Sequence, residues 1–200
     1  MIEQDNMQTR RTLLQRIGDV ENAHAWYEFV YYYRGYIYSI LRKMQVSHHD
    51  AEEIVQQVLL KVSDIIKTFT YDPARGSFRG YLARITANTA RNHFRSLRHD
   101  VSLSEMDDHD EILQGATGES ELDKLAEEEW TRHLYRIAWR NVSTGFGEKV
   151  RQTWEMLYEG KGVETIATAL ELTESTIYVY KKRVQEKLEH ELKRLKVELG

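Results

Sequence analysis

Residues 162–188 read GVETIATALELTESTIYVYKKRVQEKL, and this stretch contains two helical patterns separated by a short turn. The first pattern has apolar side chains at helical spacing, namely Val163, Ile166, Ala167 and Leu170. Residues 171–173 form a tight turn, and Thr173 or Ser175 can cap a second helix that runs from Glu174 to Leu188 or beyond. This order predicts a helix-turn-helix.

The second of these helices has one apolar and one polar face. Ile177, Val184 and Leu188 share the apolar face, and Leu192, Leu195 and Leu199 continue it. A helix of this kind can present its polar face to the major groove of DNA. The predicted groove-facing residues are Ser175, Thr176, Tyr178, Lys182 and Arg183, and Val179 and Glu186 also point outward. The alternative is an ordinary helical hairpin with a charged surface.

The whole composition favours an all-α protein. The chain has 200 residues, one proline and no cysteine, and 30% of its residues are charged. The absence of cysteine excludes disulfides, cysteine-ligated metals and thiol nucleophiles. No apolar run approaches the ~20 residues that span a bilayer, and the N-terminus lacks a signal-peptide pattern. We therefore expect a cytoplasmic protein without membrane insertion.

Charge divides the chain into three parts. Residues 1–98 carry 14 basic and 10 acidic side chains, residues 99–130 carry 1 and 12, and residues 131–200 carry 13 and 10. This pattern predicts two small helical domains, 1–98 and 126–200, joined by an acidic flexible linker over 99–125. The linker is interpreted either as a solvated tether or as an acidic strand that mimics nucleic acid in a basic channel.

Three helices are predicted in the first domain, besides one around residues 12–20. Apolar side chains recur at helical spacing from Phe29 to Met44, from Ala51 to Ile66, and again after a turn over residues 70–77. Ser47 is a suitable N-cap for the second of these helices. Trp130, Trp139, Phe146 and Trp154 are expected in the core of the second domain.

The third helix carries a polar stripe. Within a narrow arc lie Arg84, Asn88, Arg91, Arg95 and Arg98, with Asn92 at the margin. Guanidinium groups pair with phosphates and amides match base edges, so the stripe suits nucleic acid, although a solvated face is the alternative. Phe69, Tyr71, Phe78 and Tyr81 lie near the preceding turn, where they either stack on unpaired bases or belong to the core.

Four segments in order carry a family resemblance: TLLQRIGDVENAHAWYEFVYYYRGYI, SHHDAEEIVQQVLLKV, FTYDPARGSFRGYLARITANTARNHFR and EGKGVETIATALELTESTIYVYKKRVQEKL. Together they resemble bacterial sigma factors of the extracytoplasmic-function group. The resemblance implies a first domain that binds the clamp coiled coil of core RNA polymerase and melts the −10 element. It also implies a helix-turn-helix domain that reads the −35 element, contact with the polymerase flap, and an anti-sigma factor as a candidate partner.

The resemblance also assigns residues. Asp50, Glu53 and Gln56 match the clamp-binding helix, and Gln57 stands where an acid is common. Arg84, Asn88 and Asn92 match positions around the −10 strand, so the expected strand-binding set is Tyr81, Arg84, Asn88, Arg91, Asn92 and Arg95. Tyr81 stands where tryptophan is usual. Tyr178, Lys182 and Arg183 match the −35 reader, and Tyr178 and Tyr180 replace arginine or other polar residues.

Other classes of protein find less support in the residues. His48, His49, Asp50, Glu52 and Glu53 contain ordinary metal ligands, but no second ligand cluster accompanies them, and we expect no metal and no cofactor. The sequence has no phosphate-binding glycine loop and no nucleophile signature, so no enzymatic activity is expected. The alternatives are a dimeric helix-turn-helix regulator that binds operator DNA without polymerase, and an interaction adaptor.

Overall fold

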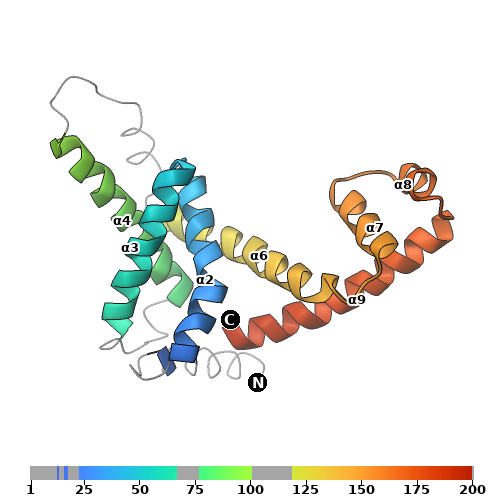
Figure 1. Cartoon of the computed structure of the whole chain (residues 1–200), viewed down its shortest axis with the longest axis horizontal. Helices are drawn as coiled ribbons and strands as arrows, with labels where there is room; N and C mark the ends of the chain where they lie inside the picture. The colour runs from blue at the N-terminus through green and yellow to red at the C-terminus, as the bar shows by residue number, and fades with distance from the viewer. Residues whose placement is uncertain (1–12, 14–15, 18–22, 67–76, 101–118, 200) are drawn as a thin grey trace. The chain divides into compact units, whose positions relative to one another are not determined.

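The computed structural model describes residues 13, 16, 17, 23–66, 77–100 and 119–199. Within these ranges it contains only helices, so the all-α prediction is confirmed (Figure 1). The helices are α2 (Ala23–Lys43), α3 (His48–Ile66), α4 (Phe78–Asp100), α6 (Glu119–Ser143), α7 (Glu148–Tyr158), α8 (Val163–Leu170) and α9 (Glu174–Leu199). Of the predicted helix over 12–20, only residues 13, 16 and 17 are described, and they are helical. Most of the turn over 70–77 and residues 101–118 of the expected linker lie outside the described residues.

The chain divides into two compact units, and the division falls inside α6, between His133 and Leu134. The sequence analysis placed the start of the second domain at residue 126 and included 119–125 in the linker. In the structure residues 119–125 are helical, and residues up to His133 belong to the first unit. None of the described helices is long and apolar enough to cross a membrane.

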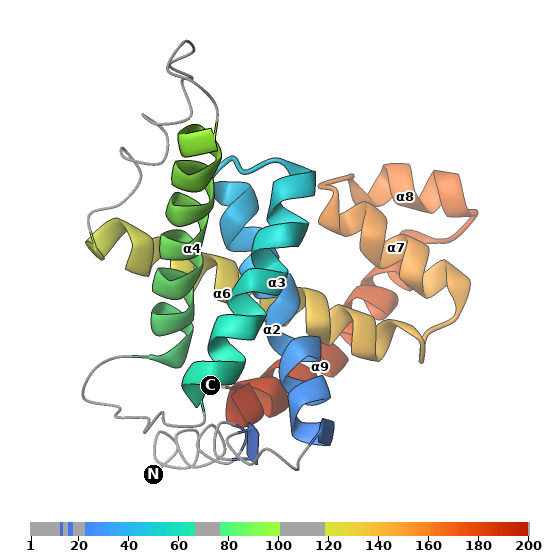
Figure 2. The same cartoon turned by 60° about the vertical axis from the view of Figure 1, so that its left-hand side comes forward.

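In the first unit, α2, α3 and α4 pack against one another (Figure 2). The apolar stripes predicted for these helices form the core, and Phe29, Ile37, Ile54 and Leu82 are all completely buried. The Ser47 hydroxyl accepts a hydrogen bond from the Asp50 backbone N–H (3.1 Å), which confirms Ser47 as the N-cap of α3.

The first half of α6 also belongs to this core. The ring of Trp130 stacks on Tyr33, with 5.3 Å between centroids, and the Tyr36 hydroxyl lies within hydrogen-bond distance of the carbonyls of Arg79 (3.1 Å) and Ala126 (3.3 Å). Burial raises the pKa of Tyr36 far above its usual range, so this hydroxyl stays protonated and remains a donor. The assignment of Trp130 to the core of the second domain is therefore wrong, because α2 offers the aromatic surface that buries it.

The second unit contains the predicted helix-turn-helix. Ile166 of α8 and Ile177 of α9 are completely buried, and the Thr173 hydroxyl accepts a hydrogen bond from the Thr176 N–H (3.3 Å) as the N-cap of α9. In the turn, Glu171 adopts a left-handed conformation with φ of 53°. The ring centroid of Trp139 lies 6.4 Å from that of Phe146 and 6.2 Å from that of Trp154, as expected for a shared aromatic cluster.

Candidate nucleic-acid and polymerase interfaces

The N-terminal half of α9 presents an open polar face. The residues predicted to read DNA lie on its outward side: Ser175, Tyr178, Lys182 and Arg183 are exposed, and Thr176 is half-buried. The Thr173 hydroxyl contacts the hydroxyls of Ser175 (2.9 Å) and Thr176 (2.8 Å), so these groups are held together at the start of the helix. The structure therefore brings all five predicted residues to one end of one helix.

The cations on this face remain available. The Arg183 guanidinium lies 5.8 Å from the centroid of the Phe146 ring, a contact that orients the side chain without neutralising it. No ion pair of Lys182 or Arg183 is found among residues 119–199. Lys149 of α7 donates to the Leu170 carbonyl (3.1 Å) and so occupies the last carbonyl of α8.

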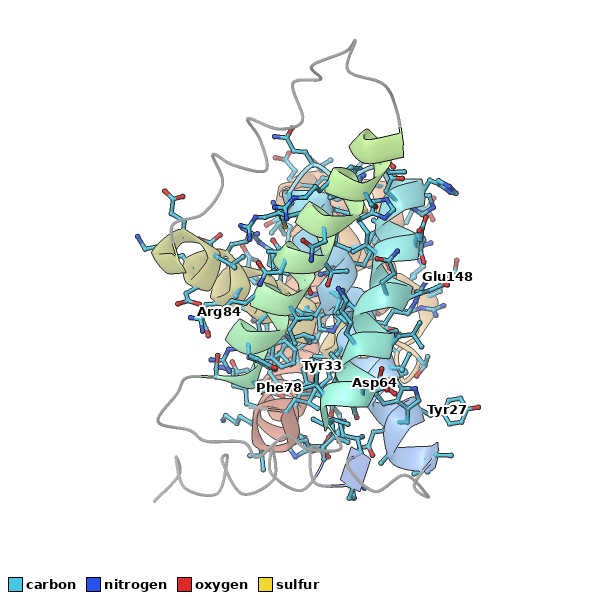
Figure 3. The ribbon with its side chains drawn as sticks, turned by 90° about the vertical axis from the view of Figure 1, so that its left-hand side faces the viewer. Tyr27, Tyr33, Asp64, Phe78, Arg84 and Glu148 are labelled. Atoms are coloured by element: carbon cyan, nitrogen blue, oxygen red, sulfur yellow. The ribbon has the colours of Figure 1, made fainter. Side chains whose placement is uncertain are left out.

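The polar stripe of α4 is partly engaged by α6. Arg84 donates from one guanidinium nitrogen to both carboxylate oxygens of Asp123, at 3.1 Å each. One turn earlier, Arg79 forms a bidentate pair with Glu127, at 2.6 and 2.8 Å. Figure 3 shows Arg84 on the side of α4 that faces α6. Carboxylates of α6 thus occupy two guanidinium groups that could otherwise bind phosphate.

The remainder of the stripe is more open. Asn88, Asn92 and Arg95 are exposed, and Arg91 donates to the Asn88 side-chain oxygen (2.9 Å). Tyr81 is half-buried, with its ring 6.4 Å from that of Phe78. Phe78 itself is buried and packs on Tyr33, so it belongs to the core (Figure 3). The Arg98 side chain, and the aromatic residues Phe69 and Tyr71, lie outside the described part of the chain.

The predicted polymerase-binding residues lie along the start of α3. Glu53 and Gln56 are exposed, and Asp50 and Gln57 are half-buried. The Gln57 amide donates to Glu53 (3.1 Å), so the amide that replaces the usual acid supports a neighbouring carboxylate.

A buried histidine of α4 lies beneath these carboxylates, and the sequence analysis did not select it. His93 Nδ1 is 3.7 Å from the Glu53 carboxylate, and His93 Nε2 is 3.9 Å from that of Asp50. Among the described residues there is no group of three or more side chains that could hold a metal ion.

Arg79, Asp123 and Glu127 were not predicted either. A signal for them existed, because Leu122, Ala126 and Trp130 recur every four residues and place the intervening Asp123 and Glu127 together beside a buried stripe. The density of acidic residues in this segment was instead interpreted as a linker.

The second unit also has an apolar groove of about 510 Å³. Its walls come from α6, α7 and α9: Tyr135, Trp154, Leu157, Tyr158, Lys181, Gln185, Leu188, Glu189 and Leu192. The rings of Tyr135 and Tyr158 stack at 5.6 Å, and Tyr158 is 73% exposed. The Trp154 indole donates to the Tyr135 hydroxyl (3.1 Å). The aromatic wall of the groove is therefore fixed in place.

Comparisons with known proteins match both halves of the chain. Residues 29–99 match sigma-70 region 2, and residues 148–194 match the bacterial regulatory proteins of the luxR family. The extracytoplasmic-function RNA polymerase sigma factor SigE of Mycolicibacterium smegmatis (strain ATCC 700084 / mc(2)155) is 28% identical over 87 residues. The match covers 44% of this chain and 32% of the relative, so the chain spans about a third of the length of that curated protein. A region 2 match followed by a helix-turn-helix match, together with the similarity to SigE, supports a sigma factor of the extracytoplasmic-function type.

Proposed function

We propose that this protein directs core RNA polymerase to promoters and initiates transcription. The observation that carries the proposal is the order of the two domains: a region 2 domain, whose helix α4 bears a stripe of arginine and asparagine, precedes a helix-turn-helix with an open polar face. A dimeric operator-binding regulator would need the second domain but has no use for the first. The first domain therefore favours a sigma factor over a regulator.

Core polymerase is proposed to bind the start of α3. Glu53 and Gln56 are exposed there, with Asp50 and Gln57 beside them, and they offer acceptors and an amide donor to the clamp coiled coil. His93 supports this surface from below, since it packs close to both carboxylates. The proposed contact residues are polar, so we expect them to contribute to the specificity and rate of binding.

The −10 element is proposed to bind along α4 after melting. Asn88, Asn92 and Arg95 are open to a single strand, and Tyr81 supplies an aromatic edge at the start of the helix. Opening a base costs a few kcal/mol, which contacts from this surface must offset. The Arg84 nitrogen that holds Asp123 can bind a phosphate only after it leaves that carboxylate. We infer that the strand displaces α6 from Arg84 and Arg79.

The −35 element is proposed to receive α9 in its major groove. Lys182 and Arg183 would bind phosphates or base edges, and the hydroxyls of Ser175 and Thr176 would contact the groove at the start of the helix. Phosphate contacts release counterions, so binding should weaken steeply with salt.

The apolar groove of the second unit is proposed to hold the polymerase flap. Its α9 residues Lys181, Leu188 and Leu192 lie on a different side of the helix from Ser175 and Lys182, at about 100° per residue. The domain could therefore bind DNA and polymerase at the same time. The protein carries out no chemistry of its own in this scheme, acts in the cytoplasm as one copy per core enzyme, and remains a candidate target for an anti-sigma factor.

A pull-down with bacterial core polymerase, followed by run-off transcription on a library of promoter fragments, tests the proposal. Stoichiometric binding of core enzyme and new start sites are the expected results. Tight binding to free duplex without core binding would instead support a dimeric regulator. Binding of core enzyme without any new start site would contradict the role in initiation and favour an adaptor.

A further inference from the structure

The centre of the reading face of α9 is apolar. Val179 is 63% exposed, and its neighbour Tyr178 is 56% exposed. At about 100° per residue, Val179 points almost opposite to the completely buried Ile177, and Ser175 and Arg183 lie on either side of it. A branched apolar side chain thus lies on the side of the helix that faces away from the core of its own domain.

The surroundings of Val179 identify the kind of partner. The side chain lies in the second turn of α9, where the positive end of the helix dipole and the cations Lys182 and Arg183 favour a polyanion. The N-terminal turns of a reading helix are the ones that contact base edges. Among the groups displayed in the major groove, the C5 methyl of thymine is the one that suits an aliphatic side chain.

We propose that Val179 reads the methyl group of a thymine in the −35 element. Valine has no hydrogen-bonding group, so it contributes to sequence choice only through this apolar contact, and it favours thymine over cytosine at that position. Tyr178 flanks the contact and helps to exclude water from it. This inference rests on the proposed function, and it adds Val179 to the residues that determine promoter choice.

The test uses holoenzyme assembled from core polymerase and the full-length chain, on a promoter obtained by the run-off selection. Each thymine of the −35 element is replaced in turn by deoxyuridine, which removes the methyl group and keeps the hydrogen-bonding edge. At one position the substitution should weaken promoter binding by about fourfold, the factor that corresponds to burial of one methyl-sized group.

Val179→Ala should reduce that sensitivity strongly, because it removes both γ-methyl groups and leaves only the shorter Cβ methyl. Val179→Thr, which keeps one of the two γ-methyl groups, should retain more of the sensitivity than Val179→Ala does. Val197→Ala is the matched control, because Val197 is a second exposed valine of α9 (43% exposed) outside the helix-turn-helix, and it should behave as wild type. Thermal unfolding confirms that each variant is folded.

Two outcomes would overturn the inference while leaving the proposed function intact. One is an unchanged ratio of thymine to uracil binding in Val179→Ala at every position, and the other is a −35 element without thymine on either strand. If the chain directs core polymerase to no promoter at all, the proposed function fails together with the inference.

Discussion

The two helices proposed to contact promoter DNA present their polar faces differently. On α9, the hydroxyls and cations near Ser175 and Lys182 are exposed. On α4, Arg84 and Arg79 are bound by the carboxylates of Asp123 and Glu127 from α6. The difference fits the two forms of DNA that we propose these helices bind: duplex DNA is available before melting, whereas the single strand appears only afterwards. A face that needs displacement of acidic side chains is suited to a step that follows opening.

The largest expected effect comes from removing the side chain that anchors α6. Trp130 is 3% exposed and stacks on Tyr33, so Trp130→Ala should lower the free energy of unfolding by about 3–5 kcal/mol, as measured by urea denaturation. It should also raise the affinity of the full-length chain for a −10 single strand. Without Trp130, α6 packs less firmly beside α4, and its carboxylates compete less with phosphate for Arg84 and Arg79.

Trp154→Ala provides the control, since it removes an indole from the second unit. It should leave the affinity for the −10 strand unchanged. Wild-type stability in Trp130→Ala would show that α6 is not anchored by this residue.

The open face of α9 should respond to loss of its cations. Lys182→Ala with Arg183→Ala should reduce run-off transcription from a −35-dependent promoter by about tenfold and leave core binding unchanged. The slope of log affinity against log salt should become shallower by about 0.9 for each phosphate that the variant no longer neutralises. Lys193→Ala with Lys196→Ala removes the same charge from the far end of α9 and should have little effect. An equal loss of core binding in Lys182→Ala with Arg183→Ala would disprove the assignment of this face to DNA.

The open end of the α4 stripe is tested by a single amide. Asn88→Ala should slow promoter opening by about 2- to 12-fold, the factor for one hydrogen bond removed, and closed-complex formation should be unaffected. Permanganate footprinting measures the unpaired thymines directly. Normal melting in this variant would remove Asn88 from the strand-binding surface.

The stability of the second unit should depend on the ionisation of Glu191, which binds Arg194 within α9 and Asn141 of α6. Hydrogen bonds from Arg194 and, to a smaller extent, Asn141 hold the pKa of Glu191 below its ordinary value of 4.5. A lowered folded-state pKa means that these hydrogen bonds stabilise the fold fully above pH 4.5, and that this stabilisation disappears as the pH falls through the folded-state pKa. Unfolding followed between pH 6 and about pH 3 should show a smaller decrease for Glu191→Gln than for wild type or for the exposed control Glu189→Gln.

Much of the fold could be predicted because local signals agree with the packing. The helical periods around Phe29 and Ile54, and the caps at Ser47 and Thr173, are decided by neighbouring residues in the sequence, and the structure contains them. The five predicted residues of the α9 face are also brought together, because they belong to one helix.

The role of α6 could not be predicted in the same way. Its apolar stripe continues from Leu122 and Trp130 to Leu134 and Ile137 without a break in composition, although the first two residues belong to one unit and the last two to the other. Because the division between the two units falls inside one continuous helix, no change in the sequence pattern marks it. The acidic residues of its first half are explained only by guanidinium groups of α4, more than 35 positions earlier in the chain.

The central claim is that α6 carboxylates cover the arginines of α4, and binding of a labelled −10 single-stranded oligonucleotide to the full-length chain tests it most directly. Asp123→Asn with Glu127→Gln should raise the affinity by about 2- to 10-fold, because two partly exposed ion pairs no longer compete with phosphate. Glu121→Gln with Glu128→Gln removes the same charge from exposed positions of α6 and should change the affinity far less. Equal affinity in wild type and Asp123→Asn with Glu127→Gln, or an equal rise in both double variants, would contradict the claim.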